Sequence, residues 1–286
     1  MNVVNLIVSA AKIPSFSSFE ERIHGFIRSV LGKYKHVEIV EINANNLLVF
    51  VNGLNDFKPV AITSHLDKIN HFGEVFPDEL HVELQGERIV GQMDDTAGIG
   101  LCLDLVQKAA HGKFPPLYIL FSEMEESMGL KQHPHLLKNH GKDVGPQIGA
   151  RRLSEYLLAN NLCPATFITL DTTPVFKGDP GVALYTEAWS KGQFEPSEAL
   201  LTKLEALKAF ICKADPDIRL ANGTNDYQVY GEYFSNPKQG DVPSIAIEPA
   251  IYPYHQIGEG VFVKDIKRIA TLLDSLLLNF DFTFAN

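Results

Sequence analysis

Histidines and carboxylates follow several apolar segments of the chain, each at the point where the segment ends. They are His65 and Asp67 after VAITS, Glu125 and Glu126 after YILFS, Asp171 after FITL, and His255 shortly after SIAIEP. A further acidic pair, Asp94-Asp95, stands in QMDDTAGIG, directly before small residues. Apolar runs of this length read as strands buried on both faces. The sequence therefore predicts that metal-binding or catalytic side chains gather at one edge of a buried sheet.

The residue types in this set indicate a particular chemistry. In open α/β sheets, ligands bind in the crevice outside the carboxyl ends of the strands. Two imidazoles and several carboxylates, with no cysteine, suit zinc and also cobalt or manganese. The set is too large for a catalytic zinc with three protein ligands, and it suits two divalent ions that share a carboxylate. Two such ions activate a water and polarise a scissile carbonyl.

The order of these elements resembles a known superfamily. The pattern His-x-Asp, Asp-Asp-x-Ala-Gly, Glu-Glu, Asp and a C-terminal His looks like that of the co-catalytic di-zinc exopeptidases, the metal-dependent aminopeptidases and carboxypeptidases. The resemblance covers nearly the whole chain. It implies that Asp94 bridges two metals. It also implies that His65 and Asp171 complete one site, and that Glu126 and His255 complete the other.

The same resemblance implies two catalytic roles. Glu125 would be the general base that moves a proton from the attacking water to the leaving amine, and Asp67 would hydrogen-bond the outer nitrogen of His65. Residues two apart on a strand face the same way, so Asp67 can stand beside His65. Neighbouring Glu125 and Glu126 can reach one metal centre only where the strand breaks into a loop, as EESMG suggests. A carboxylate beside a ligating imidazole fixes its tautomer.

Each residue also has an ordinary structural interpretation. Asp94-Asp95 alone reads as a helix N-cap, and Glu125-Glu126 alone reads as a solvated face. These ordinary interpretations can exclude a metal site only if all of them hold at once. The candidate residues would then have their order and their positions at strand ends by coincidence. We assign Asp94 as the bridge and Asp95 as the cap or as a hydrogen-bonding partner of a ligand. Three further histidines are expected in a loop rather than in a third metal site: His133, His135 and His140.

Three other residues lie near the predicted site in the sequence. Asp226, in the segment NGTNDY, follows an Asn-Gly turn and resembles a supporting residue of the same superfamily. Tyr252 and Tyr254 flank the His255 loop, where they can line a substrate pocket or belong to the core.

Alternating strand-like and helix-like segments predict an α/β protein with a mainly parallel sheet. We expect a three-layer α/β/α sandwich around a mixed, mostly parallel sheet, the phosphorylase/hydrolase-like fold of the zinc exopeptidases. SFEE at 18–21 reads as a capping box that opens the second helix. The expected helices are 3–11, the one after the capping box, 95–110, 150–160, 196–213 and 263–279. The expected strands are 36–42, 45–53, 59–64, 117–122, 166–170, 181–188 and 244–249.

The spacing of the candidate ligands bears on domain organisation. Branches with a separate lid or dimerisation domain carry an insertion on the order of 100 residues, longer than an ordinary loop. The gaps in this chain do not hold one. We therefore expect a single catalytic domain over 1–286, closest to the single-domain aminopeptidases. Segment 131–149 is expected to be a loop or a cap inserted within it.

Composition excludes several classes of function. The formal net charge is −10 and no basic run occurs, which argues against nucleic acid as a partner. No apolar run reaches the ~18 residues that a membrane span needs. The three cysteines are far apart in sequence, which fits a reducing compartment, and we expect a cytoplasmic protein. The apolar N-terminus lacks a preceding positive charge and reads as a packed helix rather than a signal peptide.

Together these features predict a zinc-dependent exopeptidase, an aminopeptidase that removes N-terminal residues. Its substrate would be a peptide or a small amide, and the sequence is compatible with an oligomer. Three alternatives stay open: a carboxypeptidase-like amide deacylase, a single-zinc glutaminyl cyclase, and a non-catalytic metal-binding relative. No Gly-x-Ser-x-Gly elbow occurs, which disfavours a covalent nucleophile.

Overall fold

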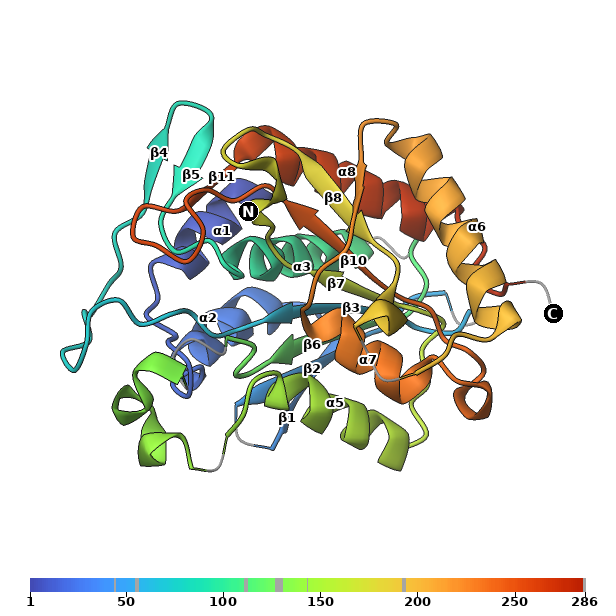
Figure 1. The fold of residues 1–286 in the computed structure, drawn as a ribbon, viewed down its shortest axis with the longest axis horizontal. Coiled ribbons are helices and arrows are strands. Elements are labelled where there is room, and N and C mark those ends of the chain that lie inside the picture. The colour runs from blue at the N-terminus through green and yellow to red at the C-terminus, as the bar shows by residue number, and fades with distance from the viewer. Residues whose placement is uncertain are drawn as a thin grey trace.

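A mixed β-sheet crosses the middle of the molecule in the computed structural model (Figure 1). The structure describes residues 1–43, 45–54, 57–110, 113–126, 131–142, 144–191 and 194–284. In this part of the chain the sheet has eight strands, in the order β1-β2-β6-β3-β7-β10-β8-β9. The strands are β1 (Val37–Ile42), β2 (Asn46–Val51), β3 (Val60–His65), β6 (Leu117–Ser122), β7 (Phe167–Leu170), β8 (Val182–Tyr185), β9 (Arg219–Ala221) and β10 (Ser244–Pro249).

Helices cover both faces of this sheet. Helices α1, α2, α3, α6 and α8 share one apolar core on one face, and α5 and α7 share a second core on the other (Figure 1). The helices are α1 (Val3–Ala11), α2 (Glu21–Leu31), α3 (Thr96–Ala109), α5 (Ile148–Ala159), α6 (Glu198–Ala214), α7 (Asp226–Phe234) and α8 (Val263–Asn279). The predicted three-layer sandwich is confirmed.

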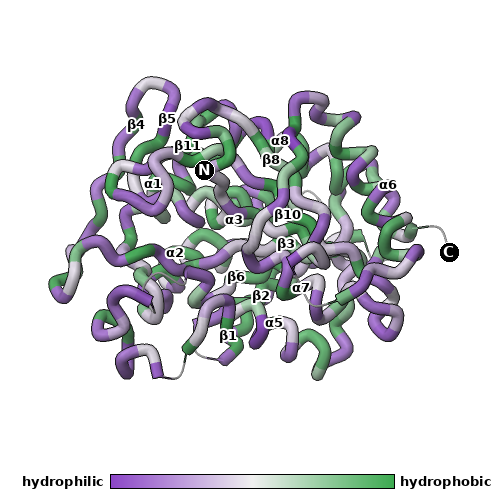
Figure 2. The backbone as a smooth tube through the Cα atoms, in the orientation of Figure 1, coloured by the Kyte–Doolittle hydropathy of each residue, from purple (hydrophilic) through white to green (hydrophobic). Residues whose placement is uncertain are grey.

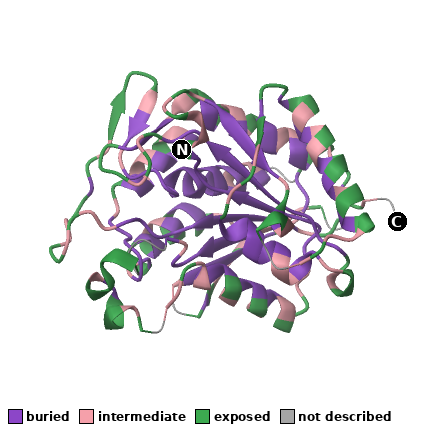
Figure 3. Ribbon diagram, in the orientation of Figure 1, coloured by how far each residue is buried: buried purple, intermediate pink, exposed green. Residues whose placement is uncertain are grey.

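The four central strands run parallel to one another. β6, β3, β7 and β10 pair in parallel, whereas β1, β2 and β8 join the sheet through antiparallel pairs. The central strands are apolar and wholly buried at almost every position, because helices cover both of their faces. Figure 2 shows the hydrophobic residues gathered on the strands and the inward helix faces, and Figure 3 shows the same regions as buried. The parallel arrangement brings four carboxyl ends to one edge of the sheet.

Helix α3 is buried almost throughout, unlike an ordinary surface helix. It lies between the sheet and α1, and α1 packs on it at close range. A methyl group added at Gly100 would lie 2.2 Å from Cγ1 and 3.1 Å from the backbone nitrogen of Ile7 in α1. The small residue at this position therefore lets two helices approach each other.

A smaller sheet and several short helical turns complete the described chain. The three strands β4 (Glu83–Gln85), β5 (Arg88–Val90) and β11 (Gly260–Phe262) form the small sheet. The turns are η1 (Pro134–Leu136), η2 (Lys138–Gly141), η3 (Pro174–Phe176), η4 (Ala188–Ser190) and η5 (Pro237–Gln239). In the described residues, no helix is both long and apolar enough to cross a membrane.

The start of α2 differs from the predicted capping box. Glu20 occupies the N-cap position and makes no side-chain cap bond. Its buried carboxylate instead accepts hydrogen bonds from the backbone N–H groups of Ser18 and Met124 and from the Asn45 side chain. The prediction was wrong because Ser18 has a left-handed backbone (φ 69°) that leaves the geometry of an N-cap. Glu20 therefore supports the loop that follows β6.

Segment 131–149 holds η1, η2 and the start of α5, and residue 143 lies outside the described residues. Lys138 ties the segment to the beginning of the chain, because its N–H bonds Ser18 Oγ and its ammonium group pairs with Glu21. The segment also faces the loop around Asn70, with His133 and His135 lining the gap between them. Its role as a cap over the site stays a prediction.

Candidate metal centre

The predicted ligands lie at the carboxyl edge of the four central strands. His65 is the last residue of β3, and Asp171 directly follows β7. Glu126 comes shortly after β6, and His255 lies in the loop after β10. Asp94 precedes α3, whose N-terminus approaches the same edge. The parallel strands thus bring together residues that are far apart in the sequence, as open α/β sheets do at their ligand sites.

Asp94 lies between the two histidines. Its Oδ1 is 3.2 Å from Nε2 of His65, and its Oδ2 is 3.3 Å from Nε2 of His255. On the first side, Asp171 Oδ1 lies 3.8 Å from the same His65 nitrogen. On the second side, Glu126 Oε1 lies 3.2 Å from the His255 nitrogen. Two of the groups that could hold a metal ion, His65/Asp94/Asp171 and Asp94/Glu126/His255, share Asp94, and a third joins His65 to Glu125 and Glu126.

The chemistry of the two sets fits divalent metal ions. Each set offers one imidazole nitrogen and carboxylate oxygens, which are the donors that zinc accepts in catalytic sites. Glu126 Oε1 is buried and outside hydrogen-bond geometry with every described donor, including the nearby His255. A buried carboxylate oxygen is costly without a cation beside it, a position that a protonated His255 or a metal ion can fill. The residues therefore fit a divalent metal site, in which Asp94 lies between the two imidazoles.

The charges in the centre shift the pKa values of its groups. Burial alone would lower the pKa of His65, but the neighbouring carboxylates of Asp67 and Asp94 outweigh it and raise the pKa well above its ordinary value. At His255, burial likewise acts downward, and Asp94 and Glu126 raise the pKa to about 10. Burial raises the pKa of Asp171 well above its ordinary range, and the adjacent Asp94 adds to this effect. The centre is thus a buried cluster of strongly interacting charges.

Asp67 connects His65 to the loop after β6. It is fully buried, and its Oδ1 lies 3.2 Å from Nδ1 of His65. The same oxygen accepts the backbone N–H of Glu125 at 2.9 Å, and Oδ2 accepts that of Glu126 at 3.2 Å. Ser17 Oγ donates a further hydrogen bond to Oδ2 at 2.8 Å. One carboxylate therefore orients an imidazole and the acidic pair together.

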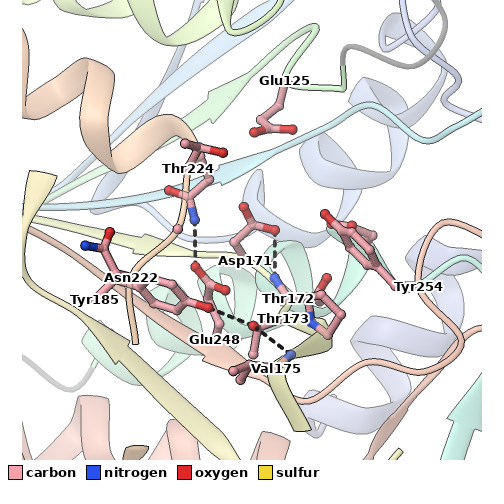
Figure 4. A pocket seen from close by; sticks show the side chains of 14 residues that line it. Glu125, Asp171, Thr172, Thr173, Val175, Tyr185, Asn222, Thr224, Glu248 and Tyr254 are labelled. Atoms are coloured by element: carbon pink, nitrogen blue, oxygen red, sulfur yellow. Dashed lines mark hydrogen bonds between the residues drawn. The ribbon is translucent and has the colours of Figure 1, made fainter. Parts of the chain in front are cut away.

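The acidic pair lies outside the strand, as its position predicted. β6 ends at Ser122, and Met124 has a left-handed backbone (φ 53°) that turns the chain. Glu125 then faces the cavity beside Asp94 and Asp171 (Figure 4). Burial raises the pKa of Glu125 well above its ordinary value, with His65 opposing the shift. The rest of the EESMG segment, 127–129, lies outside the described residues.

The neighbours Asp94 and Asp95 do different things. Asp95 caps α3, accepting the N–H of Gly98 at 2.8 Å, and it accepts a 2.6 Å hydrogen bond from Ser64 Oγ. The predicted cap is confirmed. A methyl group on Gly98 would lie 2.2 Å from the Asp95 carboxylate, so the cap needs glycine there. Glu259 Oε1 accepts the backbone N–H of Asp94 at 3.2 Å, which fixes the main chain at this residue.

A cavity of about 310 Å³ opens beside the centre (Figure 4). Tyr254 lines it and stacks on His255, whereas Tyr252 is half-exposed and lies outside its wall. The lining residues are Asp94, Glu125, Asp171, Thr172, Thr173, Pro174, Val175, Tyr185, Asn222, Gly223, Thr224, Asn225, Glu248 and Tyr254. A volume of this size is at the lower end of known ligand pockets.

Several supporting residues were not identified from the sequence. Ser17 and Glu259 carry no pattern of their own and reach the centre only through the fold. Glu248 did carry a signal, because it is a charged residue inside the apolar strand SIAIEP. Asp226, which the sequence analysis named as a supporting residue, is buried and accepts a hydrogen bond from Ser122 Oγ at 2.5 Å. Burial raises the pKa of Asp226 to about 6.

The three histidines of segment 131–149 form no metal cluster with the residues that the structure describes. His133 precedes η1, His135 lies within η1 and His140 lies in η2, and all three are exposed. The interpretation of this histidine-rich segment as a loop fits the structure.

Comparison with known proteins gives matches at the level of structure. No protein-family pattern and no curated protein matches the sequence. The TET aminopeptidase from the marine sediment archaeon Thaumarchaeota archaeon SCGC AB-539-E09 has a TM-score of 0.69 and 13% identity, with 99% of this chain and 98% of that chain covered. An aminopeptidase from the archaeon Desulfurococcus kamchatkensis has a TM-score of 0.67 and 14% identity, with 99% and 97% covered.

A third structure is that of the Pyrococcus horikoshii TET1 peptidase, which can assemble into a tetrahedron or a large octahedral shell. Its TM-score is 0.64 at 13% identity, with 98% of this chain and 100% of that chain covered. These matches extend over the whole chain and include the strands that carry the buried His/Asp/Glu groups. Over nearly its whole length the chain therefore has the fold of these peptidases, as its resemblance to the di-zinc exopeptidases predicted.

Proposed function

We propose that the protein is a metal-dependent aminopeptidase that removes the N-terminal residue of a peptide. The observation that carries the proposal is the position of Asp94, whose two carboxylate oxygens face the imidazoles of His65 and His255 at 3.2 and 3.3 Å. A carboxylate between two ligand sets is what two ions sharing one ligand require. Asp171 and Glu126 complete the two sets.

The ions would be divalent, zinc in preference to cobalt or manganese, because the donors are imidazole nitrogen and carboxylate oxygen. A pair of such ions polarises a scissile carbonyl and makes water a better nucleophile. The chain supplies the proton transfer. Glu125 accepts a proton from the attacking water on its carboxylate and delivers it to the nitrogen of the leaving amine.

Asp67 holds His65 and Glu125 in place for this reaction and does not itself contact the substrate. Its hydrogen bond to Nδ1 of His65 leaves Nε2 free to ligate, and its hydrogen bonds to the loop keep Glu125 beside the cavity. A general base must lie within hydrogen-bond reach of the proton that it takes. The carboxylate of Asp67 thus couples the placement of one ligand to that of the base.

The size of the cavity supports an exopeptidase. Its volume of about 310 Å³ is at the lower end of known ligand pockets, which favours the end of a peptide over a long extended segment. A substrate whose N-terminal residue occupies the cavity would place its first peptide bond beside Asp94 and Glu125. This arrangement favours removal of a single N-terminal residue.

The test combines metal analysis with two matched substrates. We expect two zinc ions per chain by mass spectrometry, and hydrolysis of a free dipeptide amide but not of its N-acetylated form. His65→Ala should lower the metal stoichiometry, with His81→Ala, an exposed histidine, as the control. Metal content that is unchanged in His65→Ala would contradict the ligand assignment. Cleavage of the acetylated form would indicate a deacylase, and one ion without hydrolysis would indicate a glutaminyl cyclase or a non-catalytic relative.

A further inference from the structure

Glu248 is a charged residue in the middle of the molecule that the proposed reaction does not use. It lies on β10, a wholly buried strand of otherwise uncharged residues, and is only 3% exposed. Its strand neighbour Ile247 pairs with Leu170 of β7, so Glu248 stands level with Asp171, which follows Leu170. The carboxyl group of Glu248 therefore reaches the same crevice as the predicted metal ligand.

The surroundings of Glu248 hold its carboxyl group in place. Asn225 Nδ2 donates a hydrogen bond to Oε1 at 2.7 Å. The Tyr185 hydroxyl lies beside the carboxyl and is itself bonded to Thr173 Oγ1 at 2.7 Å. Tyr185 comes from β8, which pairs with β10, so both side chains project from the same face of the sheet. The carboxyl is a positioned group at the inner wall of the cavity.

Carboxyl groups are the only ionisable acid or base groups among the described acidic and basic side chains that line the cavity. Four carboxyl groups line it, and none of its lining residues is a lysine, arginine or histidine. Under the proposed function, Asp94 and Asp171 bind metal and Glu125 moves the proton. Glu248 is the one of the four that has no such role. A buried carboxylate is stable when a cation lies beside it, and no described basic side chain lines this cavity to provide one.

We infer that Glu248 is a specificity-determining residue that binds the cationic side chain of an N-terminal lysine or arginine. This inference rests on the proposed aminopeptidase function. The alkyl stem of such a side chain would lie against Pro174, Val175 and Tyr254, which also line the cavity. Its charged end would meet the Glu248 carboxyl, whose remaining lone pairs can accept N–H groups beyond the one that Asn225 donates.

The experiment compares substrates that differ mainly in the charged group. Lysyl, arginyl, norleucyl and glutaminyl p-nitroanilides are measured with the zinc-loaded wild type and with Glu248→Gln. The wild type should prefer the lysyl and arginyl substrates over the norleucyl one by at least ~100-fold in kcat/KM, since a site built for a polar group rejects an analogue that lacks it. Glu248→Gln should lose this preference and retain norleucyl hydrolysis.

Two results would overturn the inference. One is a wild type that hydrolyses norleucyl and lysyl substrates equally well. The other is an equal loss for all four substrates in Glu248→Gln, which would indicate that Glu248 binds the α-amine shared by every substrate.

A binding measurement separates failure of this inference from failure of the proposed function. Calorimetry with free L-lysine and L-norleucine, on the zinc-loaded wild type and on Glu248→Gln, requires no hydrolysis. Tighter binding of lysine that depends on Glu248 supports the pocket even if no peptide is cleaved. If Glu248→Gln does not fold, the wild type alone decides, because equal affinity for the two amino acids would overturn the inference.

Discussion

Asp67 Oδ1 accepts a hydrogen bond from the backbone N–H of Glu125 at 2.9 Å, although 58 positions separate the two residues in the chain. The bond joins the end of β3 to the loop after β6. It places a carboxylate that orients His65 next to the residue that we propose as the general base. The ligand and the base therefore share one anchor, and a change at that anchor should affect both.

Asp67→Asn tests this coupling. Asp67 Oδ2 now accepts hydrogen bonds from the backbone N–H of Glu126 and from the hydroxyl of Ser17. In asparagine one carboxylate oxygen is replaced by an NH₂ group, which donates and cannot accept, so at least one hydrogen bond is lost. We expect zinc affinity to fall by about 10–100-fold, as it does when a hydrogen-bonding partner of a ligating histidine is changed. Competition with a chromophoric chelator measures it.

The control for Asp67→Asn is Ser17→Ala, which deletes only the hydroxyl contact to Asp67. Its effect on zinc affinity should be smaller. Equal affinities in the wild type and Asp67→Asn would show that Asp67 does not position the centre.

Glu125→Gln isolates the proton transfer. The amide keeps the size of the side chain but cannot accept the proton of the attacking water. We expect the metal content to remain at the wild-type level and kcat to fall by at least ~100-fold, the usual contribution of a general base. Glu205→Gln, at an exposed position of α6, is the matched control. An active Glu125→Gln enzyme would require another base.

Gly100→Ala should destabilise the protein, because its methyl group would meet the backbone of Ile7 in the adjacent helix. Overpacking of this kind costs about 1–3 kcal/mol in the free energy of unfolding. Gly25→Ala is the matched control in α2, where no atom lies within 4 Å of the added methyl group. The control should be stabilised by about 0.5–1 kcal/mol, because alanine favours a helix over glycine. Urea denaturation of both variants measures the difference, and equal stabilities would contradict the close helix packing.

Asp265 predicts a pH dependence of stability at a distance from the metal centre. The residue is buried at the start of α8 and accepts the N–H of Gly181, and burial raises its pKa from 3.8 to about 6. In the folded protein it keeps its proton up to about pH 6, whereas the unfolded chain releases it near pH 4. Its contribution to stability is therefore complete below pH 4 and is lost as the pH rises through 6.

The comparison is with Asp265→Asn, which stays neutral and can still accept the Gly181 N–H. Relative to this variant, the wild type should lose up to about 3 kcal/mol of stability between pH 4 and 7, since one pKa unit corresponds to about 1.4 kcal/mol. Urea unfolding at a series of pH values measures both proteins. Parallel stability curves would contradict the raised pKa of Asp265.

The layered fold could be predicted because its main signals are local. β3, β6, β7 and β10 are short apolar runs, and α8 has an amphipathic period, so each is visible in a few consecutive residues. Helix α7 was missed because it is short and buried over most of its length, including the polar Asp226 and Gln228, so its polar and apolar residues do not separate into two faces. The strands β4, β5, β9 and β11 were missed because three residues are too few to show an alternation.

The candidate ligands could be named from the sequence because their types are unusual at strand ends and their order resembles that of a known superfamily. Their mutual distances could not be derived in this way. Glu20 is an example of a contact that the sequence does not reveal. The segment SFEE matches a capping box, but the Glu20 carboxylate accepts the backbone N–H of Met124, which is 104 positions away. A local pattern does not reveal a partner that distant in the chain.

The sequence by itself determined the buried strands, the residues at their carboxyl ends and the chemistry of those residues, because backbone preference and side-chain type are properties of short segments. Only the tertiary structure decided that Asp94 lies between His65 and His255, that Asp67 holds the Glu125 loop, and that Glu248 faces a cavity. These relationships depend on the order and register of the strands in the sheet. That order results from the packing of the whole chain, so no short segment encodes it.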